Sequence, residues 1–235
     1  MIPEWLYFLF NPTILNRYGL KFIDGFIVTF ELVFIACSVG FFLGMLIAFV
    51  RLSHNKFLQY IAHAYVYFFR GSPLLAQLFL FYYGLGSMND FWKQVGLWWF
   101  FQNAWYCCLF IFALNSAAYQ SEIFKGSFLS VKTGQHEASK ALGLSSSVTF
   151  FKIILPQAMV LALRPLGNEF ILMIKSSAIA SLITIYDLMG IAKLTYSRTF
   201  DFQVYVWVAL IYLFIVEIIH RFIVFIEHRL TRYLR

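Results

Sequence analysis

Long runs of apolar residues alternate with short polar segments along the whole chain. A membrane-spanning helix needs about 20 apolar residues, and five runs approach or exceed this length. We predict spans at residues 25–50, 57–85, 97–119, 157–174 and 204–225, the second interrupted at Gly71. The apolar stretch 177–191 is too short and too interrupted for a span, so we expect a re-entrant or interfacial helix there. The pattern predicts an all-α integral membrane protein with about five transmembrane helices in one domain, 1–235.

Composition supports this class and excludes an ordinary soluble domain. Of the 235 residues, 61% are hydrophobic and only 12% are charged. The net charge of +7 fits basic loops beside a membrane, so we expect the lipid bilayer and no nucleic acid as partner. The cysteines, including the adjacent Cys107 and Cys108, have no disulfide or metal-site spacing. The histidines show no ligand or triad spacing either, so the sequence predicts neither a metal site nor a catalytic centre.

Basic residues indicate the orientation, because they collect in cytoplasmic loops. The denser set consists of Arg51, Lys56, Lys125, Lys132, Lys140, Lys152, Arg221, Arg229, Arg232 and Arg235. The sparser set consists of Arg17, Lys21, Lys93, Lys175, Lys193 and Arg198. We therefore expect a periplasmic N-terminus and a cytoplasmic C-terminus. Trp5 and Tyr7 suit a short helix at the membrane interface.

The longest polar segment, residues 135–156, predicts a helix–turn–helix. Good helix formers run from Glu137 to Leu142, and Gly143 follows where a helix ends in the left-handed conformation. The serines at 145–147 can cap a second helix. Pro156 then predicts a change of direction. On these residues alone, the segment is an amphipathic loop that offers polar groups to a soluble partner.

The same segment resembles the E-A-A motif of permease subunits of bacterial ATP-binding-cassette (ABC) importers. That motif is E-A-A, three residues, G, nine residues and I-x-L-P, and the matching residues are Glu137, Ala138, Ser139, Gly143, Ile153, Leu155 and Pro156. Ser139 replaces an alanine, a small-for-small change. The resemblance implies a type-1 ABC transmembrane domain, with these seven residues in a cytoplasmic ATPase-coupling loop at about 132–156, between spans 3 and 4.

Two further segments resemble the branch of this family that takes up polar amino acids, the histidine-, arginine- and glutamine-type permeases. One is F-R-G-S-P-L-L-A-Q-L-F in the second span, with Arg70 and Ser72, and the other is N-S-A-A-Y-Q-S-E, from Asn115 to Glu122. Physically, Gly71 and Pro73 break the helix and create a helix N-terminus that can face an anion. The alternative is a purely structural role, in which the break only determines how the helices of the bundle pack.

Polar residues in the fourth span provide a tentative substrate path. Asn168 and Glu169 lie in the middle of that span, and Glu169 shares a helix face with Ser176. A carboxylate at this depth costs on the order of 2.5–3.5 kcal/mol, so it should face water, a ligand or a partner. The candidate path residues are Glu169, Asn168, Ser176, Arg70 and Ser72. A structural ion pair of Glu169 with a basic residue of another helix is the alternative, and Glu31 has no assigned role.

The leading functional hypothesis is the permease subunit of an ATP-driven importer for polar amino acids, among which basic ones are a candidate. No phosphate-binding loop of the G-x-x-x-x-G-K-[ST] type occurs, so ATP and Mg²⁺ are expected on a separate ATPase, and this chain is not predicted to be an enzyme or to hold a cofactor. The resemblance implies an ATPase dimer, a second permease (a paralogue rather than a copy), a periplasmic substrate-binding protein and a site in the bacterial inner membrane. A self-contained channel or secondary transporter is the alternative.

Overall fold

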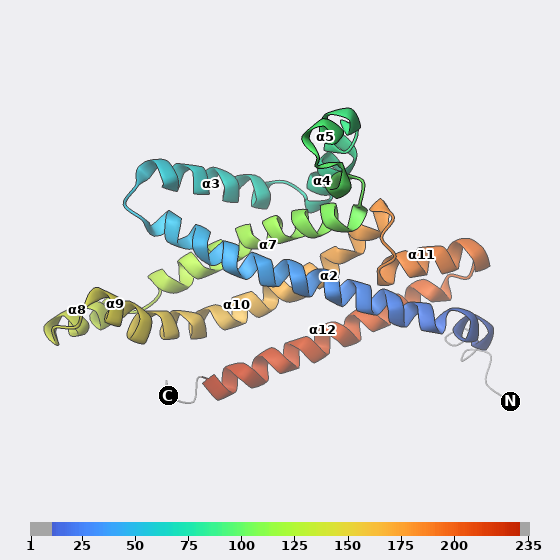
Figure 1. Cartoon of the computed structure of the whole chain (residues 1–235). Coiled ribbons are helices and arrows are strands. Elements are labelled where there is room, and N and C mark those ends of the chain that lie inside the picture. Colours follow the sequence, from blue (N-terminus) through green and yellow to red (C-terminus); the bar gives the residue numbers. More distant parts are fainter. Residues whose placement is uncertain (1–10, 231–235) are drawn as a thin grey trace. The chain divides into compact units, whose positions relative to one another are not determined.

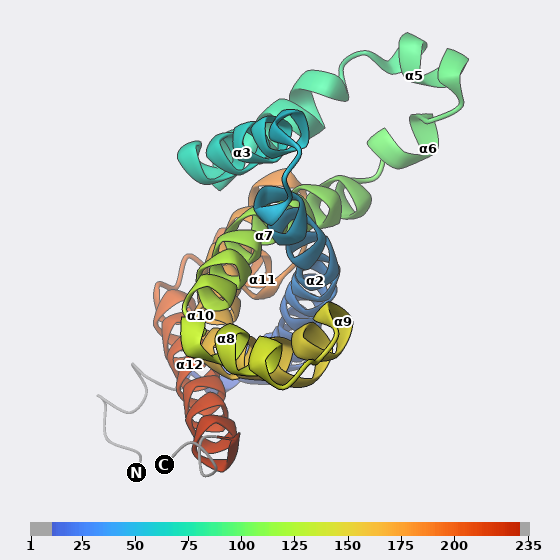
Figure 2. The same ribbon diagram turned by 90° about the vertical axis from the view of Figure 1, so that its left-hand side faces the viewer.

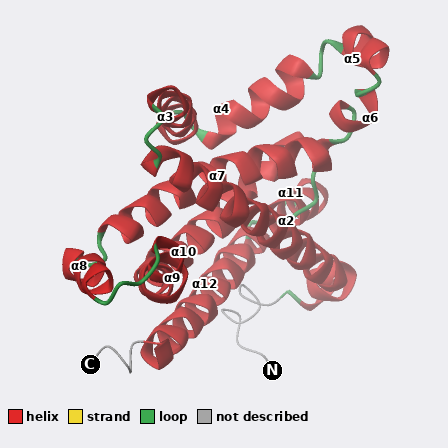
Figure 3. Cartoon of the chain, turned by 60° about the vertical axis from the view of Figure 1, so that its left-hand side comes forward, coloured by secondary structure: helices red, strands yellow, loops and turns green. Residues whose placement is uncertain are grey.

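The structure, a computed structural model, describes residues 11–230. The interfacial helix expected around Trp5 and Tyr7 lies outside the described residues. All regular elements in the described part are helices joined by short loops (Figure 3). The predicted all-α class is confirmed.

Four segments of the described chain are long and apolar enough to cross a membrane. They are α2 (Pro12–Leu52), α7 (Ala104–Leu129), the run Ser146–Ile183 and α12 (Gln203–Leu230). The run Ser146–Ile183 consists of α9 (Ser146–Val148), the π-helix η2 (Thr149–Ile154), α10 (Leu155–Ser176) and the 3₁₀-helix η3 (Ser177–Ile183). These segments can be followed by colour in Figure 1. They coincide with four of the five predicted spans.

The second predicted span is divided. α3 (Lys56–Gly71) ends at the predicted break, and two residues, Ser72 and Pro73, separate it from α4 (Leu74–Phe79). The π-helix η1 (Leu80–Leu85) extends α4, and the combined apolar helix Leu74–Leu85 is shorter than the four long segments. Ser72 is the C-cap of α3, and its hydroxyl donates to Phe68 O at 2.7 Å, while Pro73 occupies the N-cap position of α4. The break is confirmed, whereas the total of five spans stays a prediction.

The third predicted span is displaced along the sequence. α5 (Asn89–Val95) and the one-turn α6 (Trp98–Phe101) precede α7, which begins only at Ala104. Asn103 caps α7, because its Oδ1 accepts from Trp105 N at 2.9 Å. α7 continues beyond the predicted end at Tyr119 because Gln120 and Ser121 are buried and hydrogen-bonded inside the fold.

The chain forms two compact units, which share the long helices. Unit 1 comprises residues 1–36, 73–112 and 172–218. Its interior includes the start of α2 packed against α11 (Leu188–Thr199): Leu188 N donates to Thr29 Oγ1 at 3.0 Å. Gly25 permits this contact, since a Cβ there would lie 2.8 Å from Ile191 Cγ1. The stretch 177–191 thus consists of η3, a short irregular segment and the start of α11.

Unit 2 comprises residues 37–72, 113–171 and 219–235. The end of α2 and the second part of α7 approach closely, because a Cβ on Gly44 would lie only 2.9 Å from Ala117 O. α8 (Thr133–Ala141) lies beside α9 and η2 in both views of the ribbon (Figures 1 and 2).

Pro156 does not end a helix, and the change of direction expected there stays a prediction. Pro156 is the second residue of α10, and the helix runs through it from η2. The wider turns of a π-helix directly before a proline relieve the clash of its ring with the preceding turn.

Candidate functional site

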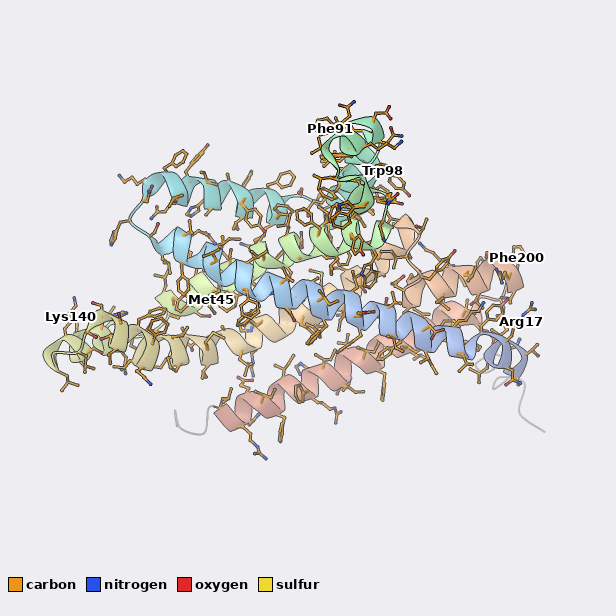
Figure 4. All side chains as sticks on the ribbon, viewed as in Figure 1. Arg17, Met45, Phe91, Trp98, Lys140 and Phe200 are labelled. Carbon is orange, nitrogen blue, oxygen red and sulfur yellow. The ribbon has the colours of Figure 1, made fainter. Side chains whose placement is uncertain are left out.

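The polar loop folds into a short exposed helix. The structure places α8 at Thr133–Ala141, close to the predicted helix that ends at Leu142. Glu137 and Ala138 are exposed, whereas Ser139 is only 1% exposed and donates its hydroxyl to Gln135 O at 2.6 Å. On α8 the motif residues Glu137 and Ala138 therefore face solvent, whereas Ser139 faces the interior. Lys140 also lies on the exposed side of α8 (Figure 4).

The turn after α8 has the geometry that the sequence predicts. Gly143 adopts φ +67°, in the left-handed region. Leu144 N donates to Ser139 O, and Gly143 N donates to Lys140 O, both at 3.0 Å. These two bonds form a Schellman motif that satisfies the last carbonyls of α8. Ser145 then caps α9 by accepting from Val148 N at 3.4 Å.

The second half of the motif anchors the loop. Ile153 and Leu155 pack against a buried cluster within unit 2. The fully or nearly fully buried members of this cluster are Ala48, Phe124, Phe128, Val131, Ile154, Ala158 and Ala162. They come from α2, from α7 and Val131 just beyond its end, and from η2 and α10, so the segment that follows the loop is packed against α2 and α7. A force applied to exposed α8 can pass into these helices, because short helices and packed cores deform little.

A charged cluster lies where the two amino-acid-importer motifs meet. Arg51 Nη1 lies 2.7 Å from Glu122 Oε2, and Arg70 Nη1 lies 3.3 Å from the same oxygen. The Arg51 side chain is 4% exposed and the Arg70 side chain 40%. Arg70 also lies over the ring of Tyr119, 5.3 Å from its centroid. One carboxylate on α7 thus links the end of α2 to the end of α3.

The break after α3 is held by the same region of α7. Asn115 Nδ2 donates to Phe69 O at 3.0 Å, and Tyr65 Oη donates to Leu114 O at 2.5 Å. The last carbonyls of a helix have no intrahelical partners, so Asn115 supplies a donor that α3 lacks. Arg70 and Ser72, expected on the substrate path, lie beside this structural junction.

Glu122 is the functional candidate that sequence reasoning missed. The third span was expected to end at Tyr119, which placed Glu122 in a loop, whereas α7 continues to Leu129. The sequence did contain residues that could have indicated this cluster. Glu122 is the acidic residue of the N-S-A-A-Y-Q-S-E segment, and Arg51 and Arg70 lie near predicted helix ends.

The tentative path residues of α10 have different environments. Glu169 is 6% exposed and makes no hydrogen bond or ion pair with any described residue. Asn168 is exposed, and both residues belong to unit 2. Ser176 is the last residue of α10 and belongs to unit 1. The structural pair considered for Glu169 is therefore not present among residues 11–230, and its basic neighbour Arg70 acts on it only through its charge.

Catalytic chemistry has little support in the described residues. No group of three or more His, Cys, Asp or Glu side chains among residues 11–230 could hold a metal ion. Cys37, Cys107 and Cys108 are free thiols.

Comparison with known proteins also finds permease subunits of transport systems. Residues 40–232 match the family model described as binding-protein-dependent transport system inner membrane component. The chain is 40% identical over 208 residues to the nopaline transport system permease protein NocM of Agrobacterium fabrum, covering 88% of this chain and 86% of that protein. It is 37% identical over 180 residues to the arginine ABC transporter permease protein ArtM of Haemophilus influenzae, covering 76% and 78%.

Solved structures agree with these sequence matches. The crystal structure of an amino acid ABC transporter with histidines matches with a TM-score of 0.81 at 34% identity, covering 92% of this chain and 96% of that one. An inward-facing MetNI methionine ABC transporter matches with a TM-score of 0.69 at 20% identity, which supports the fold alone.

Proposed function

Because the chain belongs to the family of binding-protein-dependent transport system inner membrane components, we propose that it carries polar amino acids, with basic amino acids as a candidate class. As a member of this family it is the transmembrane permease subunit of an ATP-driven importer in the bacterial inner membrane. ATP is hydrolysed by a separate subunit, and a substrate-binding protein delivers the cargo. A relative named for arginine transport supports a basic substrate.

The coupling role of α8 rests on one observation. The helix presents Glu137 and Ala138 to solvent while Ser139 is buried, and η2, beside α8, and the start of α10 pack through Ile153 and Leu155 against the buried cluster of unit 2. We propose that α8 inserts into the ATPase, which holds ATP and Mg²⁺, and that Glu137 meets a basic residue there. Gly143 and Pro156 are assigned to the turn behind α8 and to the start of the long helix.

We also propose that Glu169 lines the substrate path. Its support is a nearly buried carboxylate with no partner among the described residues, since such a group in a membrane helix is stabilised by water or by a cationic ligand. Asn168, Ser176, Arg70 and Ser72 remain candidate path residues, although Arg70 is also part of the Glu122 cluster. The second permease that completes the path is proposed to be a paralogue.

The test is purification of the complex through a tag on this chain, followed by identification of every co-purifying subunit by mass spectrometry. The complex is then reconstituted in liposomes with the binding protein, and uptake of labelled L-arginine, L-glutamine and L-leucine is measured with and without ATP. We expect a stoichiometric ATPase, a second permease of different sequence, and ATP-dependent uptake of arginine. Uptake that needs neither ATP nor an ATPase would support a channel or secondary transporter instead.

A further inference from the structure

Unit 1 contains a polar pocket that is separate from the coupling loop and from Glu169. Its volume is about 850 Å³, within the range of roughly 300–1,000 Å³ that small-molecule sites occupy. Four segments contribute to its wall: α2 with Glu31, η1 with Tyr82, the start of α7 with Ala104 and Trp105, and residues 184–186 between η3 and α11. All of these residues belong to the same compact unit.

Glu31 gives this pocket its charge. It is an exposed carboxylate in the middle of an apolar helix, and it makes no hydrogen bond or ion pair with any residue between 11 and 230. The other residues that line the pocket include no lysine, arginine or histidine. A carboxylate without a partner on an apolar helix is unfavourable, and a cationic group from outside the chain would stabilise it.

Another part of the wall favours negative charge. The first residues of α7 line the pocket, and the first N–H groups of a helix have no intrahelical acceptors. α7 has 26 residues, so its N-terminus carries the positive end of a full helix dipole. Asn103 Oδ1 accepts from the Trp105 N–H, which leaves the N–H of Ala104, the other residue of α7 that lines the pocket, for a ligand. A carboxylate is the kind of group that such a helix end binds.

The backbone of the wall is held in an unfavourable conformation. Thr184 has φ +69°, a left-handed conformation that is rare for a β-branched residue. Tyr83 Oη donates to Leu182 O at 3.2 Å and so ties the preceding turn to η1. Strain of this kind collects at ligand sites, because the surrounding structure must maintain it. Tyr82, Trp105 and Tyr186 add aromatic surface that can contact an ammonium group and the aliphatic part of a side chain.

We propose that this pocket binds the head group of an α-amino acid, with Glu31 taking the α-ammonium and the N-terminus of α7 taking the α-carboxylate. A single wall that carries both charges matches a zwitterion better than a simple anion or cation. The proposal rests on the proposed amino-acid transport and adds a site to it. In the topology predicted from the basic residues, Glu31 lies near the outer end of its span, so we place this pocket on the outer side of the membrane, where substrate enters.

The experiment measures protection of a cysteine placed in the pocket. Ala104→Cys is a small change at a half-buried lining position, and Met88→Cys on an exposed residue outside the pocket is the matched control. The purified complex, without binding protein, is labelled by a water-soluble thiol reagent in the presence of L-arginine, L-citrulline or agmatine. Citrulline keeps the head group and has a neutral side chain, whereas agmatine lacks the carboxylate.

We expect arginine and citrulline to slow labelling of Ala104→Cys, agmatine to protect weakly, and Met88→Cys to be unaffected. Glu31→Gln should raise the concentration of arginine and of citrulline needed for half-protection about tenfold or more, because a charge-assisted hydrogen bond is lost. Glu31→Asp, which retains the charge, should keep part of the protection and also serves if Glu31→Gln fails to accumulate.

Other results would overturn the assignment. Absence of protection, or protection that is unchanged in Glu31→Gln, removes the pocket as a substrate site. Loss of protection by arginine alone, with citrulline unaffected, would assign Glu31 to the side chain and contradict the head-group assignment. ATP-dependent uptake by the wild-type complex is measured in parallel: protection without any amino-acid uptake would reject the proposed function and leave the binding site standing.

Discussion

In the cluster formed by Arg51, Arg70 and Glu122, the burial of each arginine determines how much its ion pair contributes to stability. Arg51 and Arg70 contact the same oxygen, but the Arg51 side chain is 4% exposed and the Arg70 side chain 40%. Removing the partner of a buried charge leaves that charge desolvated and uncompensated, whereas an exposed pair is screened by water. Arg51 Nε already has no hydrogen-bond partner among the described residues, so the Arg51 side chain depends on its contacts with Glu122 and Ser121.

We therefore predict that Glu122→Ala destabilises the complex by about 3 kcal/mol, within the range for breaking a buried pair. Arg70→Ala, the matched control at the exposed side of the cluster, should cost about 1 kcal/mol or less. The midpoint of thermal unfolding of the detergent-solubilised complex, followed by the amount that remains monodisperse, gives the comparison. A larger shift for Arg70→Ala than for Glu122→Ala would contradict the assignment of Arg51 as the buried partner.

Gly143 is required by its backbone conformation and not by lack of space. No atom lies within 4 Å of the position of a Cβ on Gly143, but its φ of +67° strains any other residue by roughly 1 kcal/mol or more. Gly134, in the same helical segment, is equally open and lies outside the left-handed region. We predict that Gly143→Asp reduces ATPase co-purification and substrate-stimulated hydrolysis, while Gly134→Asp and Leu144→Asp change them little. Equal tolerance at positions 143 and 134 would mean that the turn is not essential.

A substitution at Glu169 can distinguish a role in the substrate path from a role in stabilising the fold. We predict that Glu169→Gln strongly reduces uptake while leaving the assembled complex and its basal ATP hydrolysis intact, because the amide keeps the shape and loses the charge. Asp90→Asn, on an exposed residue of α5, is the control for loss of a carboxylate. If the Glu169→Gln chain fails to accumulate in the membrane, Glu169 stabilises the fold; uptake at the wild-type rate would remove it from the path.

At the scale of elements, α8 behaves as a short rigid unit with two faces. Its buried contact is made through Ser139, while Glu137 and Ala138 are exposed and form no ion pair within the described chain. The Schellman turn closes α8, and Ile153 and Leu155 pack η2 and the start of α10, which follow this turn, against the buried cluster of unit 2. These features suit a helix that receives a push from a second chain and passes it on.

We predict that Glu137→Lys abolishes coupling, because it places a like charge opposite a basic residue of the ATPase. His136→Lys adds a positive charge at the neighbouring exposed position outside the motif and serves as the control. ATPase co-purification and substrate-stimulated hydrolysis are measured separately for each variant. Full substrate-stimulated transport by Glu137→Lys would reject α8 as the coupling element.

At the scale of the whole molecule, the chain exposes many large apolar side chains along its spanning helices. On α2 they include Phe34, Phe42 and Leu46, and on α12 they include Leu213, Phe214 and Phe222. Such surfaces are stable against lipid or against another permease, and not in water. This agrees with a multi-pass protein that supplies one part of a shared path.

The predicted topology has its own test. Ser146→Cys, at the start of α9, should react with a membrane-impermeant thiol reagent only in inverted vesicles, because the coupling loop is predicted to be cytoplasmic. Met88→Cys should react from outside in intact cells. Both positions are exposed, so access to the reagent is decided by the side of the membrane. The reverse pattern of labelling would invert the orientation.

The sequence by itself determined the features that depend on neighbouring residues. The apolar runs fixed four of the long helices, and Gly71 with Pro73 fixed the break after α3. Helix formers followed by Gly143 fixed α8 and its left-handed turn. Each of these follows from local hydrophobicity, helix propensity and permitted φ values, which act over a few residues.

The tertiary structure decided everything that depends on pairing between distant segments. It extended α7 beyond Tyr119, where Gln120 donates to Cys37 O and Ser121 accepts from Arg51, both on α2. It brought Arg51 and Arg70 to Glu122, and it assembled the Glu31 pocket from four separate segments. It also carried the helix through Pro156 by means of a π-helix. The sequence contains the residues for these arrangements, but their distances are set only when the helices pack, since the favourable contacts form between residues that are far apart along the chain.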